Sequence, residues 1–239
     1  MIVQRQNMAY RIEYSRKGTK IMNLPNKITI SRVVMIVLMI IALFTLEIIG
    51  QVNSSFRLDP IWGTNFNIVN FVICIVFVIA ASTDWLDGYL ARKNNQVTDF
   101  GKFMDPLADK ILVNSILIFL CMPQSYASVP YTIPVFLVII MLVRDFAVDG
   151  LRLIAVQRKR VIAANVFGKM KTVAQMVTIP VLLLAGFPFS YFDADWNQYI
   201  QIGTILLIIT TIISVISGII YFAQNYKVLK EEKKDEQPK

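Results

Sequence analysis

The sequence predicts an all-α integral membrane protein with six transmembrane helices. Of its 239 residues, 56% are hydrophobic and 17% are charged, and the mean hydropathy is +0.57. Soluble domains carry about 25% charged residues. A hydrocarbon layer of roughly 30 Å takes about 20 apolar residues of helix. Six runs meet that length or approach it, at about residues 28–49, 67–92, 103–122, 133–155, 172–187 and 198–224.

Positive charge is concentrated on one side of the predicted membrane. The loops after the second and fourth runs contain Lys93, Lys102, Arg158, Lys159, Arg160, Lys169 and Lys171, whereas the three opposite loops contain only Arg57. By the positive-inside rule, both termini face the cytoplasm. The net charge of +8 therefore reflects topology and attraction to anionic lipid, and no basic soluble domain indicates nucleic-acid binding.

The chain divides into one membrane domain with two polar ends. Residues 1–21 are basic and lack the apolar core of a secretory signal. We expect them to form either a helix at the cytoplasmic interface or a disordered leader. Residues 22–226 form the membrane domain, and residues 227–239 form a charged cytoplasmic tail.

The composition restricts the available chemistry. There is no histidine, which excludes imidazole bases and imidazole metal ligands. Cys74 and Cys121 lie singly in apolar runs, which favours small core residues over a zinc site or a disulfide. The remaining reactive groups include carboxylates, and a cluster of carboxylates prefers hard cations such as Mg²⁺ or Mn²⁺.

Four of the five aspartates in "DWLDGYLARKNNQVTDFGKFMDPLAD" are regularly spaced at the end of the second run and the start of the third. The fifth, Asp99, is expected in the connecting loop, off this pattern, in a loop or capping role. On a helix, Asp84 and Asp87 share a face with Gly88 and Ala91, and Asp105 and Asp109 lie one turn apart on the next helix. Ion pairs with neighbouring Arg and Lys would explain one such acid. Four acids on facing helices repel each other, and a bound divalent cation offsets that repulsion. The small Gly88 and Ala91 leave room for a ligand.

This stretch resembles the signature of the CDP-alcohol phosphatidyltransferases, D-x2-D-G-x2-A-R-x8-G-x3-D-x3-D. The eight matching positions are Asp84, Asp87, Gly88, Ala91, Arg92, Gly101, Asp105 and Asp109. The resemblance covers about residues 22–226 and includes "MNLPNKITISR" at the start of the first run. The segments "RDFAVDGLR" and "GKMKT" are similar to the branch that makes phosphatidylglycerophosphate.

The resemblance implies a reaction in which CDP-diacylglycerol and sn-glycerol 3-phosphate give phosphatidylglycerophosphate and CMP. It also implies six helices around a polar cavity open to the cytoplasm, a homodimer, and a bacterial cytoplasmic membrane. Membrane lipid would surround the protein and supply the donor.

The resemblance also implies roles for individual residues. Asp84, Asp87 and Asp105 would hold one or two Mg²⁺ or Mn²⁺ ions, and Asp109 would be the general base or a further metal ligand. The residues expected along CDP-diacylglycerol are Asn26, Thr29, Arg32, Asp84, Asp87, Gly88, Ala91, Arg92 and Gly101. For Asn26, Thr29 and Arg32, ordinary helix capping is the alternative.

The acceptor carries a phosphate, so the site should contain basic side chains. The candidates are Lys110, Arg144, Arg152, Lys169 and Lys171. Arg144 and Arg152 lie within the fourth run, where a charge is costly to bury and therefore usually has a functional role. An internal Asp149–Arg152 pair is the alternative for Arg152, and a topological role is the alternative for Lys171.

Two other functions compete with this one. Within the family, the acceptor could be inositol 1-phosphate, serine, choline or phosphatidylglycerol. Outside it, a divalent-cation transporter would also place acids in membrane helices. A transporter predicts acids near the bilayer midplane in broken or repeated helices, whereas these acids lie near one rim beside arginines.

Overall fold

The computed structural model describes residues 24–61, 64–93, 99–158, 166–193, 196–197 and 199–226. Within these ranges, the side chains at 24–28, 84–93, 99–103 and 193 are outside the description. The predicted leader at 1–21 and the predicted tail at 227–239 also lie outside the described residues.

The described chain is helical, as predicted. Its helices are α2 (Leu24–Val52), α3 (Ile68–Lys93), α4 (Asp99–Cys121), α5 (Val135–Gln157), α6 (Val166–Leu183), the short α7 (Ser190–Asp193) and α8 (Ile202–Asn225). Each of the six long helices overlaps one of the six apolar runs. Asp99, which the sequence placed in a loop, is instead the first residue of α4.

The fifth run is the one whose bounds were predicted poorly. It was expected at 172–187, but α6 begins at Val166 and ends at Leu183. Ala185 and Gly186 adopt positive φ angles of 47° and 81°, and the Gly186 amide donates to the Val181 carbonyl at 2.8 Å. This left-handed turn ends the helix although the apolar sequence continues.

The chain forms two compact units. The first contains the described residues within 1–39 and 79–111, and the second contains the described residues within 40–78 and 112–239. In the first unit, Ile36 of α2 and Ala108 of α4 are fully buried.

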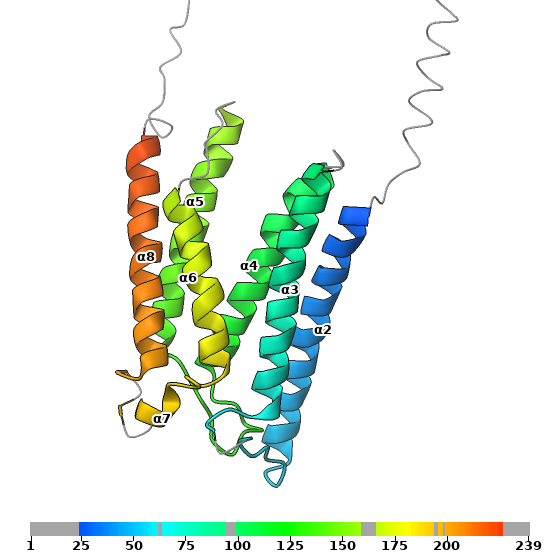
Figure 1. Cartoon of the computed structure of the whole chain (residues 1–239), viewed down its shortest axis with the longest axis vertical. Helices are drawn as coiled ribbons and strands as arrows, with labels where there is room; N and C mark the ends of the chain where they lie inside the picture. Colours follow the sequence, from blue (N-terminus) through cyan, green and yellow to red (C-terminus); the bar gives the residue numbers. More distant parts are fainter. Residues whose placement is uncertain are drawn as a thin grey trace, which may run out of the picture. The chain divides into compact units, whose positions relative to one another are not determined.

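In the second unit, α8 packs against both α5 and α6 (Figure 1). Val148, Leu151 and Ala155 of α5 form a buried apolar cluster with Tyr221 of α8. Thr178 of α6 and Thr210 of α8 share a buried hydrogen bond of 2.7 Å.

The end of α2 is joined to the loop between α4 and α5, also within the second unit. Glu47 accepts hydrogen bonds from the amide and the hydroxyl of Ser125, and Leu58 forms a β-bridge with Ala127. Tyr126 is fully buried. The pKa of its phenol is raised mainly by this burial and also by the nearby negative charge of Glu47. These contacts fix the loop against the helix.

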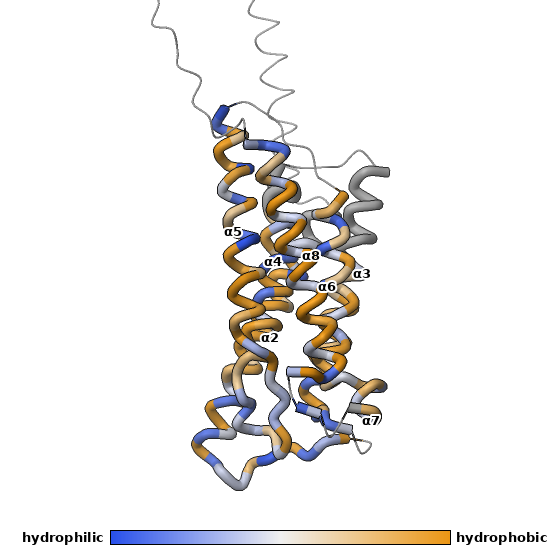
Figure 2. Tube along the Cα trace, turned by 90° about the vertical axis from the view of Figure 1, so that its left-hand side faces the viewer, coloured by the Kyte–Doolittle hydropathy of each residue, from blue (hydrophilic) through white to orange (hydrophobic). Residues whose placement is uncertain are grey.

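The helices have the surface of a membrane protein. Within the described residues, Thr29–Val52, Val166–Leu183 and Ile202–Asn225 are long and apolar enough to cross a bilayer. Hydrophobic residues dominate α5, α6 and α8 (Figure 2). Large apolar side chains such as Phe44, Val143 and Phe146 are exposed, which suits contact with lipid and not with water.

Gly50 is required where α2 meets the loop. A Cβ at this position would lie 2.6 Å from the Tyr126 amide nitrogen and 2.7 Å from the Ser125 carbonyl carbon. Because both neighbours are backbone atoms, we expect Gly50→Ala to lower stability by about 1–3 kcal/mol. Thermal unfolding in detergent measures the effect as a lower Tm. The matched control is Gly150→Ala, whose Cβ would meet no atom within 4 Å. Equal Tm values for the two variants would contradict the close approach.

Candidate active site

Most of the residues predicted to bind CDP-diacylglycerol have side chains outside the described part of the structure. Asp84, Asp87, Gly88, Ala91 and Arg92 all lie within α3, Gly101 lies within α4, and Asn26 lies within α2. The continuous helix α3 satisfies the spacing argument that Asp84 and Asp87 share one face. The positions of their carboxylates stay a prediction.

Two of the four aspartates are described, and both lie on α4. Asp105 and Asp109 are one helical turn apart and half-buried. The Thr29 hydroxyl of α2 donates a hydrogen bond of 2.8 Å to Asp105 Oδ1. This bond orients the carboxylate, and among the described residues Oδ2 has no hydrogen-bond partner.

The capping interpretation of Thr29 is wrong. Thr29 lies inside α2, which begins at Leu24, and not at its N-cap, and its hydroxyl donates to a carboxylate on another helix. Arg32 lies further along α2 and is also buried. Sequence reasoning placed Thr29 beside the nucleotide and did not foresee its bond to Asp105.

The described acids fit a hard divalent cation in their chemistry. Asp105 and Asp109 supply carboxylate oxygens, which Mg²⁺ and Mn²⁺ prefer. Among the described side chains, no three of His, Cys, Asp or Glu are placed to hold a metal ion together. Asp84 and Asp87 are not among these described side chains. A metal at this site therefore stays a prediction.

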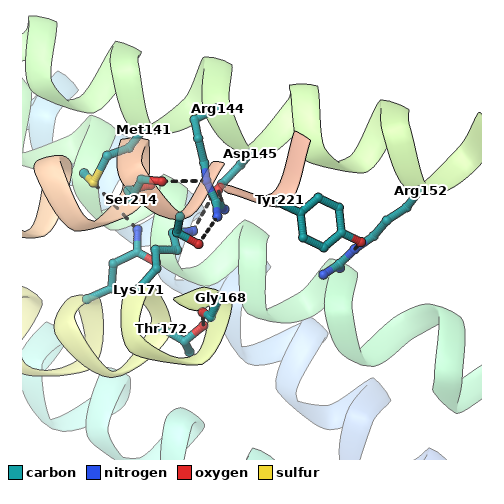
Figure 3. A network of polar contacts seen from close by, with 11 residues as sticks. Met141, Arg144, Asp145, Arg152, Gly168, Lys171, Thr172, Ser214 and Tyr221 are labelled. Carbon is teal, nitrogen blue, oxygen red and sulfur yellow. Dashed lines mark hydrogen bonds and ion pairs between the residues drawn. The ribbon is translucent and has the colours of Figure 1, made fainter. Parts of the chain in front are cut away.

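A second polar cluster lies in the other unit, between α5, α6 and α8 (Figure 3). Asp145 binds two cations, each through a different oxygen. Arg144 Nη1 donates to Oδ1 at 2.9 Å, and Lys171 Nζ donates to Oδ2 at 2.6 Å. Asp145 is 7% exposed and Lys171 is 9% exposed. Low exposure strengthens these ion pairs and makes an unpaired charge costly.

Helix α8 supplies the other acceptors for Arg144. Its Nε donates to the Ser214 carbonyl at 2.9 Å, and its Nη2 donates to Ser217 Oγ at 2.7 Å. We call Arg144, Asp145, Lys171, Ser214 and Ser217 the buried cation network.

The other residues predicted to bind the phosphate of the acceptor substrate do not join this network. Arg152 Nε donates to the Tyr221 hydroxyl at 3.1 Å, and its guanidinium carbon lies 5.4 Å from the centre of that ring. Within the described residues, this replaces the expected alternative of a pair with Asp149. Lys169 is exposed on α6, and Lys110 lies on α4 in the other unit.

Sequence reasoning missed Asp145, Ser214 and Ser217. Asp145 is adjacent to Arg144, and adjacent residues on a helix do not normally face each other. The two serines lie in the uncharged sequence of α8. The sequence feature that could have indicated the two serines is the set of polar residues on one face of the otherwise apolar α8. Such residues also occur where membrane helices merely pack together.

Comparison with known proteins decides the family. Residues 22–220 match the CDP-alcohol phosphatidyltransferase family. The chain belongs to this family. The resemblance carried by the eight-position motif is thereby confirmed, and the cation-transporter alternative loses its basis.

The chain is similar to family members named CDP-diacylglycerol–glycerol-3-phosphate 3-phosphatidyltransferase. The Bacillus subtilis protein is 38% identical over 208 residues, which is 87% of this chain and 97% of the relative. The Mycoplasma pneumoniae protein is 36% identical over 213 residues, covering 87% and 89%. An Arabidopsis thaliana protein, number 2 of that name, is 28% identical over 219 residues, covering 89% and 83%.

The shared carboxylate of Asp145 should be important for stability. Asp145→Asn leaves Arg144 and Lys171 without their common counter-charge, so we expect a loss of about 3–5 kcal/mol, seen as a lower Tm in detergent. Lys171→Met added to this variant should cost less than the sum of the two single changes. Asp59→Asn in an exposed loop is the control, and it should change stability by no more than about 1 kcal/mol. Strict additivity of the two changes would show that the pair is not coupled.

Proposed function

We propose that this protein transfers the phosphatidyl group of CDP-diacylglycerol to sn-glycerol 3-phosphate, giving phosphatidylglycerophosphate and CMP in phosphatidylglycerol synthesis. The observation that carries this proposal is the similarity, at up to 38% identity over 87% of the chain, to enzymes named for this donor and acceptor. The buried cation network agrees with an acceptor that carries a phosphate.

The reaction is a phosphoryl substitution. The 1-hydroxyl oxygen of glycerol 3-phosphate forms a bond to the β-phosphorus of CDP-diacylglycerol. The bond from that phosphorus to the bridging oxygen breaks, and CMP leaves with the electron pair. The hydroxyl proton passes to a base, for which Asp109 is our candidate, because it is a half-buried carboxylate at the motif's last position.

Asp84, Asp87, Asp105 and Asp109 would hold Mg²⁺ or Mn²⁺. A divalent cation supplies charge neutralisation at the pyrophosphate. Thr29 supports this role for Asp105, because its hydroxyl fixes one carboxylate oxygen and leaves the other for a ligand. Gly88, Ala91, Arg92, Gly101, Asn26 and Arg32 remain proposed contacts of the cytidine diphosphate.

Arg144 and Lys171 are the best-supported residues for the acceptor phosphate. Asp145 holds them close together, and a guanidinium and an ammonium both donate charge-assisted hydrogen bonds to phosphate oxygens. Arg152, Lys169 and Lys110 are weaker candidates, because none of them belongs to the network.

We also propose six membrane spans with both termini in the cytoplasm of a bacterial cell. Besides the three strongly apolar spans, α5 has 23 residues and its charges are partly neutralised by the buried pairs. Phe189, Tyr191, Phe192, Trp196 and Tyr199 are exposed between α6 and α8, as is typical of a membrane interface. The cytoplasmic polar cavity and the homodimer rest on the family resemblance.

The acceptor can be tested directly by CMP release. Purified protein in detergent, with CDP-diacylglycerol and Mg²⁺ or Mn²⁺, should release CMP with glycerol 3-phosphate at least about tenfold faster than with inositol 1-phosphate, serine, choline or phosphatidylglycerol. Faster release with another acceptor would reject glycerol 3-phosphate. No release with any acceptor would reject the reaction.

The role of Asp109 can be separated from metal binding. If Asp109 is the base, Asp109→Asn should lower kcat by about 10²–10⁴-fold and leave binding of CDP-diacylglycerol and Mn²⁺ intact. Asp59→Asn is the matched control, because its carboxylate lies in an exposed loop. Loss of Mn²⁺ binding together with activity would make Asp109 a metal ligand instead.

A further inference from the structure

Arg144 is held mainly by a helix that has no charge of its own. The described residues supply three hydrogen-bond acceptors for Arg144, and two of them, the Ser214 carbonyl and Ser217 Oγ, lie on α8. The third is Asp145, its neighbour on α5. A guanidinium is planar, so three acceptors around it define both its position and its plane.

Gly218 provides the space for this arrangement. A Cβ at position 218 would lie 2.9 Å from Arg144 Cγ and 3.1 Å from Nε. The aliphatic part of Arg144 therefore lies directly against the backbone of α8. Any larger residue would push the arginine away from Ser214 and Ser217.

We propose that Ser217 and Gly218 of α8 are positioning residues for the acceptor phosphate, acting through Arg144. This inference rests on the proposed function. Arg144 has five N–H groups, and the contacts to Ser214, Asp145 and Ser217 use three. Two N–H groups, one on each terminal nitrogen, have no acceptor among the described residues. The contacts from α8 decide where these two groups point.

The same contacts also influence Lys171. Asp145 joins Arg144 through Oδ1 and Lys171 through Oδ2, so a shift of Arg144 changes the position of the shared carboxylate. Helix α8 thereby helps to place both cations, although only α5 and α6 carry them. Acceptor affinity should thus depend on a serine that does not itself touch the acceptor.

The competing interpretation is that Ser217 only helps α8 to pack. Small polar residues commonly occur where membrane helices pack closely. A packing role predicts less folded enzyme, which lowers the apparent kcat and leaves both KM values unchanged. A positioning role predicts a selective change in the KM for glycerol 3-phosphate.

The test compares Ser217→Ala with Thr211→Val, using full-length enzyme and CMP release. Thr211 is a matched control because it is buried on α8 and its hydroxyl, within the described part of the chain, bonds only to the Leu207 carbonyl of its own helix. We expect Ser217→Ala to raise the KM for glycerol 3-phosphate about five- to tenfold, and to leave the KM for CDP-diacylglycerol within about twofold. Thr211→Val should change neither KM by more than about twofold.

Two further variants make the test specific. Ser217→Thr keeps the hydroxyl and should restore the KM for glycerol 3-phosphate to within about threefold of wild type. Gly218→Ala should raise that KM at least as much as Ser217→Ala. Unchanged KM values in Ser217→Ala, or equal increases for both substrates, would overturn the positioning role while the proposed function stands. A wild-type enzyme that releases no CMP with glycerol 3-phosphate would overturn both.

Discussion

A buried charge in an apolar helix must be paired, and Asp145 meets this requirement for two helices at once, α5 and α6. Its two oxygens bind Arg144 of α5 and Lys171 of α6, and Arg144 in turn binds α8. Moving α5 or α6 along its axis by one turn, about 5.4 Å, would separate Lys171 from Asp145. Moving α8 by one turn would remove two hydrogen-bond acceptors of Arg144, the Ser214 carbonyl and Ser217 Oγ. The register of α5 and α6 therefore depends on this one carboxylate, and the register of α8 depends on its contacts with Arg144.

The same pairing suits a site for a charged substrate. Arg144, Asp145 and Lys171 include two cations and one anion, so they carry a formal charge of +1 together. A fully neutral set would have less attraction for a phosphate, and isolated cations would cost more to bury. In our proposal the network combines stability with a preference for an anion, and it would thereby serve an acceptor that carries its own phosphate.

In the other unit, Asp105 of the motif is held by a hydrogen bond from Thr29 on a different helix. Asp105 and Asp109 were predicted correctly as neighbours one turn apart, because α-helical spacing alone determines that relation. The hydrogen bond from Thr29 to Asp105 was not predicted, since the two residues are 76 positions apart in the sequence. Sequence spacing describes one helix at a time and says nothing of the side chain that approaches from another helix.

Local and compositional properties were within reach of the sequence alone. The apolar runs predicted the six long helices, the spacing of eight residues indicated the family, and the missing histidine removed whole classes of mechanism. The tertiary structure decided which charges meet. It joined Asp145 to Lys171, gave Arg144 two acceptors on uncharged α8, and paired Arg152 with Tyr221. The physical reason is that periodicity along one helix predicts which residues share a face, whereas a contact between helices depends on their packing and register.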